Sequence, residues 1–201
     1  ISGYSELIQN GMTNEEETIR FAGEIHKSAK RLLTLINDTI RLSQLDTSEQ
    51  KVIYEAIDLY KIAEDCVNML KFSAENHGIT ISIHGTNAYL EGNKEMLEEV
   101  VYNLCDNAIR YNNEGGKVDV TVKPVKGKIY LCVEDNGIGI SKEHQERIFE
   151  RFYRVDKSRS KSTGVGLAIV KHIIQQHGAH MELTSEKGKG TKIEIEFSKS
   201  R

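Results

Sequence analysis

The sequence predicts an α+β protein in two parts, a helical hairpin over residues 1–48 and a two-layer α/β sandwich over residues 49–201. Between residues 15 and 45 the apolar residues keep a helical spacing without proline. After residue 48 helical and strand-like patterns alternate, and glycines lie between the strand-like runs. Helices segregated over a mostly antiparallel sheet are typical of a two-layer α/β sandwich.

The hairpin is predicted from its seam and its caps. Thr13 and Asn14 precede three glutamates, which is typical of a helix N-terminus, and Gly11 marks a turn after the end of a preceding helix over residues 1–10. The seam residues, spaced by three and four, are Ala22, Ile25, Ala29, Leu32 and Ile36. Because so narrow a hairpin buries little alone, we expect a homodimer in which two copies form a four-helix bundle.

The second part is predicted from alternating periodicities. Helices are expected over residues 59–76, 94–111 and 165–177, and strands over 51–56, 79–84, 88–91, 118–123, 129–135, 181–185 and 191–197. Turns are expected at Gly127, Gly188 and Gly190. The polar, cationic stretch 155–163 is expected to be a mobile loop.

Composition excludes several classes of function. A net charge of −3 with interspersed signs gives no basic field, so we expect no nucleic-acid partner. Cys66, Cys105 and Cys132 are an odd number in apolar stretches, which favours free thiols in a reducing compartment. No run approaches the ~20 apolar residues of a membrane span, so we expect no membrane contact in this fragment.

The helix over residues 94–111 has an unusual polar face. Asn103, Asn107 and Arg110 are spaced by four and three, which places two carboxamides and a cation along one side. Amide oxygens can join nucleotide phosphates in holding Mg²⁺, and arginine can neutralise phosphate charge. The alternative is an ordinary solvated face, and Tyr111 either stacks on a ligand or ends the helix.

Two glycine-rich segments add to this pattern. Asp135 ends a strand before Gly137 and Gly139, where it could accept a hydrogen bond from an amine such as that of adenine; a simple turn is the alternative. Gly164 and Gly166 open a helix, whose N-terminal N–H groups can bind phosphate. The turn 188–191 is either ligand-facing or a plain hairpin. Each segment alone is weak, but their order together predicts a nucleotide site.

These segments together resemble the catalytic ATP-binding domain of sensor histidine kinases, in the GHKL superfamily with its Bergerat-type fold. The match runs over residues 51–197 and has five motifs in register. They are the N box (103–111), the G1 box (135–139), the F box (148–152), the G2 box (163–167) and a glycine turn (188–191).

The resemblance implies the roles of individual residues. Asn103 and Arg110 would be catalytic neighbours of the phosphates, Asn107 the principal Mg²⁺ ligand and Asp135 the acid that reads adenine. Phe149 and Phe152 would anchor a lid over ATP. The full set expected to bind ATP is Asn107, Tyr111, Asp135, Gly137, Gly139, Ile140, Phe149, Phe152, Tyr153, Thr163, Gly164, Val165, Gly166, Leu167 and Thr191.

The chain also departs from the family pattern. Its hairpin resembles the dimerisation and histidine-phosphotransfer domain, but the H box with the phosphoacceptor histidine is absent, and His26 lies on the wrong helix. Lys161 and Ser162 precede Thr163 where many relatives have further glycines, so the lid is expected to be shorter or stiffer. Ser162 and Thr163 are expected to cap the helix that follows.

The resemblance implies the cytoplasmic kinase core of a membrane-anchored receptor. It would bind ATP with Mg²⁺, phosphorylate a histidine of the dimerisation domain and serve a response-regulator receiver domain as partner. One alternative is a gyrase-type ATPase, which has a glutamate general base where this chain has Asn103, an amide that cannot take a proton. The other is a non-catalytic dimeric signalling scaffold.

Overall fold

The computed structural model describes residues 1–46, 52–155 and 163–198. The chain divides into two compact units, one formed mainly by residues 1–48 and the other by most of residues 49–201. No helix in these described ranges is long and apolar enough to span a bilayer.

The smaller unit is a helical hairpin of α1 (Ser2–Gln9) and α2 (Glu15–Asp46). Gly11 turns the chain with a φ of 63°. Asn14 and Glu17 form a reciprocal capping box, in which each side chain accepts a hydrogen bond from the other's backbone N–H, at 2.9 and 3.1 Å. The rings of Tyr4 and Phe21 stack with their centroids 4.7 Å apart. The predicted cap and turn are therefore confirmed.

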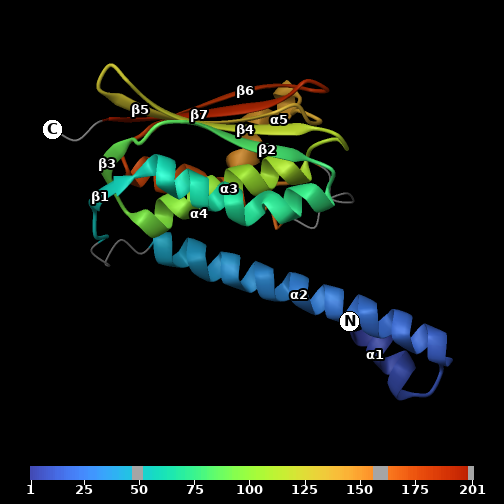
Figure 1. Ribbon diagram of the computed structural model, residues 1–201. Helices are drawn as coiled ribbons and strands as arrows, with labels where there is room; N and C mark the ends of the chain where they lie inside the picture. The colour runs from blue at the N-terminus through green and yellow to red at the C-terminus, as the bar shows by residue number, and fades with distance from the viewer. Residues whose placement is uncertain (47–51, 156–162, 199–201) are drawn as a thin grey trace. The chain divides into compact units, whose positions relative to one another are not determined.

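The larger unit combines a mixed sheet with a layer of helices (Figure 1). In chain order its elements are β1 (Glu55–Asp58), α3 (Leu59–Asn76), β2 (Thr80–Gly85), β3 (Tyr89–Gly92), α4 (Lys94–Arg110), β4 (Lys117–Val125), β5 (Lys128–Asp135), α5 (Lys142–Gln145), the 3₁₀ helix η1 (Arg147–Phe149), α6 (Gly166–Gln176), β6 (His180–Glu186) and β7 (Gly190–Ser198).

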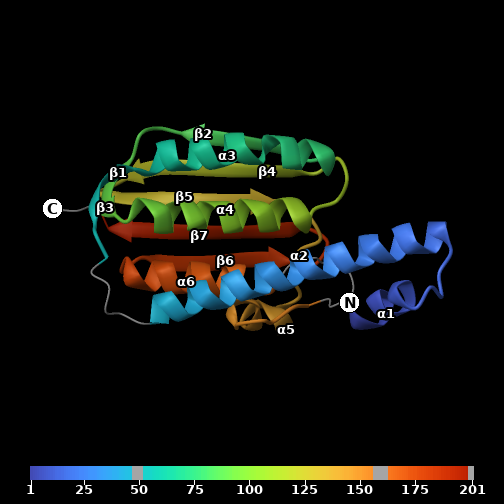
Figure 2. The same ribbon diagram turned by 90° about the horizontal axis from the view of Figure 1, so that it is seen from below.

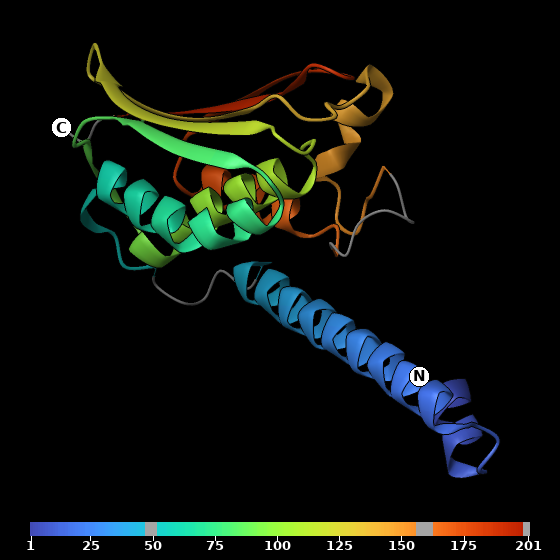
Figure 3. The ribbon, with the colours of Figure 1, turned by 45° about the vertical axis from the view of Figure 1, so that its right-hand side comes forward.

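The main sheet has five strands in the order β2-β4-β5-β7-β6. Only β2 and β4 are parallel, and the other pairs are antiparallel. Helices α3, α4 and α6 lie side by side beneath one face of this sheet (Figure 2). Figure 3 shows the curved sheet above these helices, with the orange segment of α5 and η1 at one end. The predicted two-layer α/β sandwich is confirmed.

The core lies between the sheet and the helices because one face of each element is apolar. Alternate residues of β4 and β5, among them Val120 and Leu131, are fully buried, and so are Leu97 and Val100 on α4. In β4 the buried valines alternate with exposed or half-buried residues such as Asp119 and Thr121, so the other face of the sheet is solvated there. The three cysteines are free and buried.

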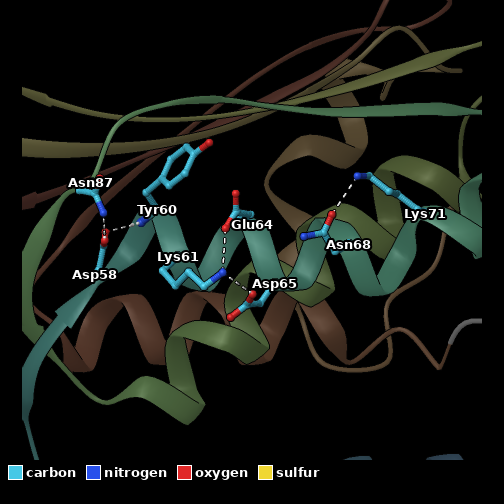
Figure 4. Close-up of polar contacts among 8 residues, drawn as sticks. All are labelled: Asp58, Tyr60, Lys61, Glu64, Asp65, Asn68, Lys71 and Asn87. Atoms are coloured by element: carbon cyan, nitrogen blue, oxygen red, sulfur yellow. Dashed lines mark hydrogen bonds and ion pairs between the residues drawn. The ribbon is translucent and has the colours of Figure 1, made fainter.

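Helix α3 begins where its sequence provides a cap. The carboxylate of Asp58 accepts hydrogen bonds from the backbone N–H of Tyr60 at 3.1 Å and from the amide of Asn87 (Figure 4). It also accepts from the backbone N–H of Ala88 at 3.0 Å. The solvent face of α3 has ion pairs from Lys61 to Glu64 and Asp65, at 2.8 and 3.0 Å. Its predicted bounds are confirmed.

The strand predicted at residues 51–56 was wrongly placed. Residue 51 lies outside the described ranges, and β1 pairs with β3 over Glu55–Asp58. The two residues before it have other partners: the carbonyl of Ile53 accepts from the side chain of Asn93 at 3.1 Å, and the hydroxyl of Tyr54 donates to the carbonyl of Gln176 at 3.0 Å. These bonds attach Ile53 and Tyr54 to the start of α4 and the end of α6 rather than to a strand.

Candidate functional site

Helix α4 presents the polar face that the sequence predicted. Its buried stripe of apolar residues packs into the core, which leaves Asn103, Asp106 and Asn107 half-buried and Arg110 exposed. The side chain of Asn93 caps the helix by accepting from the N–H of Met96 at 2.9 Å. Tyr111 is the C-cap residue, so the polar face ends with the helix.

Asn103 lies against the start of α6. Its amide nitrogen donates to the carbonyl of Glu99 at 2.9 Å, which fixes the side-chain orientation. A Cβ atom added to Gly166 would lie 2.6 Å from the Asn103 Oδ1 atom. The structure thus brings the N box and the G2 box together, and any larger residue at the first position of α6 would require the Asn103 side chain or the helix to shift.

Arg110 has an acidic partner that the sequence reasoning missed. Its Nε atom lies 2.6 Å from the Asp106 carboxylate, one turn earlier on α4. Burial alone would lower the pKa of Arg110, but the bond and attraction to Asp106 outweigh it, so the pKa is raised. A phosphate approaching Arg110 would compete with this carboxylate. The i, i+4 spacing of opposite charges is the signal that could have identified Asp106.

Asp135 ends β5 as a half-buried carboxylate. Its Oδ1 atom accepts from the N–H of Gly137 at 2.8 Å, and the N–H of Thr191 on β7 also bonds to the carboxylate. Burial raises the pKa of Asp135, and these two N–H groups offset part of that rise. The carboxylate keeps further acceptor capacity for a ligand.

The loop after Asp135 is pressed between α4 and the β6–β7 turn. A Cβ atom on Gly137 would lie 2.5 Å from the Tyr111 carbonyl oxygen, and the N–H of Ile138 donates to that same oxygen at 3.0 Å. Gly139 has a φ of 61°, and its Cβ atom would overlap the carbonyl oxygen of Glu186. Both glycines are therefore required by close backbone approach.

Two further polar residues hold this loop, and sequence reasoning missed both. The hydroxyl of Ser185 on β6 accepts from the N–H of Ile140 at 2.9 Å. The amide of Gln145 on α5 donates to the carbonyls of Ile140 at 2.9 Å and Ser185 at 2.8 Å. No local motif marks these residues, because the bonds from Ile140 and from Gln145 to Ser185 join segments 45 and 40 residues apart.

The F box forms the stem of the segment between η1 and α6. Tyr153 hydrogen-bonds to Nδ1 of His144 at 2.6 Å, and the Arg147 guanidinium lies 4.3 Å from its ring centre. Phe152 is 52% exposed with a φ of 63°. A Cβ atom on Gly164 would lie 2.8 Å from the Tyr153 carbonyl oxygen, so the two ends of the segment meet.

The remaining predicted residues are less closely connected. Val165 is fully buried, so only its backbone could face a ligand, while Phe149 and Leu167 are half-buried. The predicted cap by Thr163 is wrong: α6 has Val165 at its N-cap and no side-chain cap. The predicted loop at 156–162, including Ser162, lies outside the described residues.

The fold is a two-layer α/β sandwich in which a polar helix face lies beside the glycine that begins α6, and an acidic carboxylate ends a central strand. Residues 92–201 match the family described as histidine kinase-, DNA gyrase B-, and HSP90-like ATPase, and the chain belongs to that family. The similarity extends to named sensor kinases. The chain is 37% identical over 195 residues to the sensor-like histidine kinase SenX3 of Mycolicibacterium smegmatis, covering 95% of this chain and 51% of that protein.

Solved structures share the fold. Full-length ShkA in complex with AMPPNP superposes with a TM-score of 0.78 at 23% identity, over 93% of this chain and 40% of that one. The histidine kinase ThkA in complex with the response regulator protein TrrA gives 0.79 at 20% identity, over 99% and 56%. The chain therefore spans about half the length of the relative SenX3 and of ThkA.

Proposed function

We propose that this chain is the kinase core of a sensor histidine kinase, which binds Mg·ATP and transfers the γ-phosphoryl group to a histidine of the dimerisation domain outside this sequence. The phosphoryl group then passes to an aspartate of a response-regulator receiver domain. The observation that carries the proposal is Asn103 lying over Gly166, because it places an amide-bearing helix face beside a helix N-terminus. The AMPPNP complex of ShkA and the regulator complex of ThkA support the nucleotide and the partner.

Each residue has a defined part in this proposal. Asp135 accepts from the adenine amine, and the N–H groups at the start of α6 bind phosphate oxygens. Asn107 would hold Mg²⁺ through its amide oxygen. Asn103 and Arg110 contact the phosphates, and Phe149 and Phe152 hold the lid stem. The neutral amide oxygens on α4 add no negative charge, so they suit an Mg²⁺ ion whose charge is already balanced by the triphosphate.

The protein's contribution to phosphoryl transfer is positioning and charge neutralisation. A histidine ring nitrogen forms the new N–P bond, the bond from the γ-phosphorus to the β,γ-bridging oxygen breaks, and ADP leaves. Mg²⁺ held by Asn107 would supply neutralisation of the phosphate charge. Asn103 is an amide held by the Glu99 carbonyl, so it cannot act as the general base of water attack.

The exposed side of α2 supports a homodimer through the hairpin. Leu32, Ile36 and Ile40 are each about half exposed, although they are apolar and regularly spaced along α2. A second hairpin would bury this stripe in a four-helix bundle. Light scattering on Ile36→Glu should give a monomer if this stripe is the interface.

Binding of Mg·ATP by calorimetry, with free phosphate followed over hours in the same sample, tests the proposal. Binding without phosphate release supports a kinase core whose acceptor histidine lies elsewhere. Sustained release would contradict it in favour of an ATPase. Absence of binding would favour the scaffold.

A further inference from the structure

The hydroxyl of Ser185 lies at the centre of three hydrogen bonds near Asp135. It accepts from the N–H of Ile140 and donates to the carbonyl of Gly190, both at 2.9 Å. Its third neighbour is the hydroxyl of Thr191, also at 2.9 Å. Ser185 is half-buried on the inner side of β6, so these bonds lie away from bulk solvent.

Counting protons fixes the direction of the third bond. A serine hydroxyl has one proton and two acceptor lone pairs. The Gly190 carbonyl can only accept, so it takes the Ser185 proton, and the Ile140 N–H can only donate, so it uses one lone pair. The bond between the hydroxyls must therefore be donated by Thr191. The Thr191 hydroxyl can then interact with another partner only as an acceptor, through its lone pairs.

This matters because Thr191 lies beside Asp135. The two residues are paired across β7 and β5, and the Thr191 backbone N–H already bonds to the carboxylate. With its proton committed to Ser185, the Thr191 hydroxyl joins the Asp135 carboxylate as an acceptor. A purine with a 6-amino group offers a donor to two acceptors, whereas a 6-oxo purine offers an acceptor.

We infer that Ser185 is a positioning residue for base specificity, which holds the Thr191 hydroxyl as an acceptor and so favours 6-amino over 6-oxo purine nucleotides. The inference rests on the proposed function, because it needs a purine at Asp135. Without the Ser185 hydroxyl, Thr191 can rotate its proton toward the base and donate to a 6-oxo group. The discrimination then falls, while the carboxylate and the fold remain.

The test is the ratio of dissociation constants for Mg·GTP and Mg·ATP, measured by calorimetry on this chain. Ser185→Ala should lower the ratio about tenfold, the value of one hydrogen bond. Ser185→Thr keeps a hydroxyl and should retain the ratio. The matched control is Gln145→Ala, which loosens the same loop through the Ile140 and Ser185 carbonyls without touching either hydroxyl. It should weaken both nucleotides equally and leave the ratio unchanged.

The outcomes separate this inference from the proposed function. A folded Ser185→Ala with the wild-type ratio, checked by circular dichroism, overturns the inference alone, as does a wild-type chain that binds both nucleotides equally. Should Ser185→Ala not fold, Thr191→Val decides, since it removes the acceptor itself: an unchanged ratio overturns the inference. A wild-type chain that binds neither nucleotide overturns both.

Discussion

The two ends of the candidate site differ in how their polar groups are bonded within the protein. At the Asp135 end, backbone N–H groups hold the carboxylate, and Ser185 and Gln145 tie the following loop to β6 and α5. At the other end, Arg110 is exposed and forms an ion pair with Asp106. The contacts of Asp135 are therefore already formed within the protein, whereas a phosphate that approached Arg110 would have to compete with Asp106 for the guanidinium.

The largest effect is expected at the preformed end. Asp135→Asn exchanges a charged acceptor for an amide that also carries donors, so Mg·ATP affinity should fall roughly 10- to 100-fold, the value of a hydrogen bond to a charged group. Calorimetry measures the change. Asp119→Asn is the matched control, because Asp119 is an exposed strand carboxylate that pairs with His84 at 3.2 Å. Equal affinity in the two variants would remove Asp135 from base recognition.

The junction between the ends should be nearly as sensitive. Gly166→Ala places a methyl group 2.6 Å from Oδ1 of Asn103, so either that side chain or the first turn of α6 must move. We expect about a tenfold loss of Mg·ATP affinity, since small misplacements are costly in a positioned site. Isothermal calorimetry and a thermal melt separate binding from folding.

Gly23→Ala provides the control for this change. Gly23 lies within α2 and a Cβ atom there meets nothing within 4 Å. This variant should leave nucleotide affinity unaltered and raise hairpin stability by up to about 1 kcal/mol. If Gly166→Ala binds ATP as tightly as Gly23→Ala, the contact with Asn103 does not position phosphate groups.

Features that depend on neighbouring residues could be predicted from the sequence, and features that depend on distant partners could not. The bounds of α3 and the start of α4 were predictable because Asp58 and Asn93 are local caps. The glycines of the site were predictable as motifs. Ser185 and Gln145 were not, because the bonds of Ser185 with Ile140 and with Gln145 join residues 45 and 40 positions apart, and no spacing rule covers such pairs. The strand at Glu55–Asp58 was predicted too early in the chain for a similar reason, since the hydrogen-bond partners of Ile53 and Tyr54 are distant in sequence.

A smaller, opposite effect is expected at the phosphate end. Asp106→Asn removes the carboxylate that holds Arg110, so the guanidinium becomes available to phosphate, and Mg·ATP affinity should rise about threefold at low salt. The gain should shrink as salt screens the charges. Asp65→Asn breaks a comparable i, i+4 ion pair, with Lys61 on α3, and should have no effect (Figure 4). A loss of affinity in Asp106→Asn would show that Asp106 helps the site rather than competing within it.

The last expected effect is on stability rather than on nucleotide affinity, and it concerns the contact between the N-cap of α4 and the C-cap of α6. Nε2 of His177, at the C-cap of α6, accepts from the N–H of Asn93, at the N-cap of α4, at 3.1 Å, and Nδ1 bonds to the Ile173 carbonyl at 2.8 Å. Since that carbonyl can only accept, the ring is neutral with its proton on Nδ1. Burial lowers the pKa of His177 below its ordinary value, so the folded state favours this neutral form.

The pH dependence of stability follows from that direction. The stabilisation is fully present above the ordinary histidine pKa and is lost as pH falls through the lowered pKa of the folded state, because the unfolded chain binds the proton first. Urea unfolding at pH 7.5 and 5.5 should show the loss, and His177→Gln should lower the free energy of unfolding at pH 7.5 by about 1 kcal/mol, the value of one hydrogen bond. His177→Gln should also flatten the pH dependence. An equally steep dependence in this variant would mean that other groups cause it, and that the α4–α6 junction is held by packing alone.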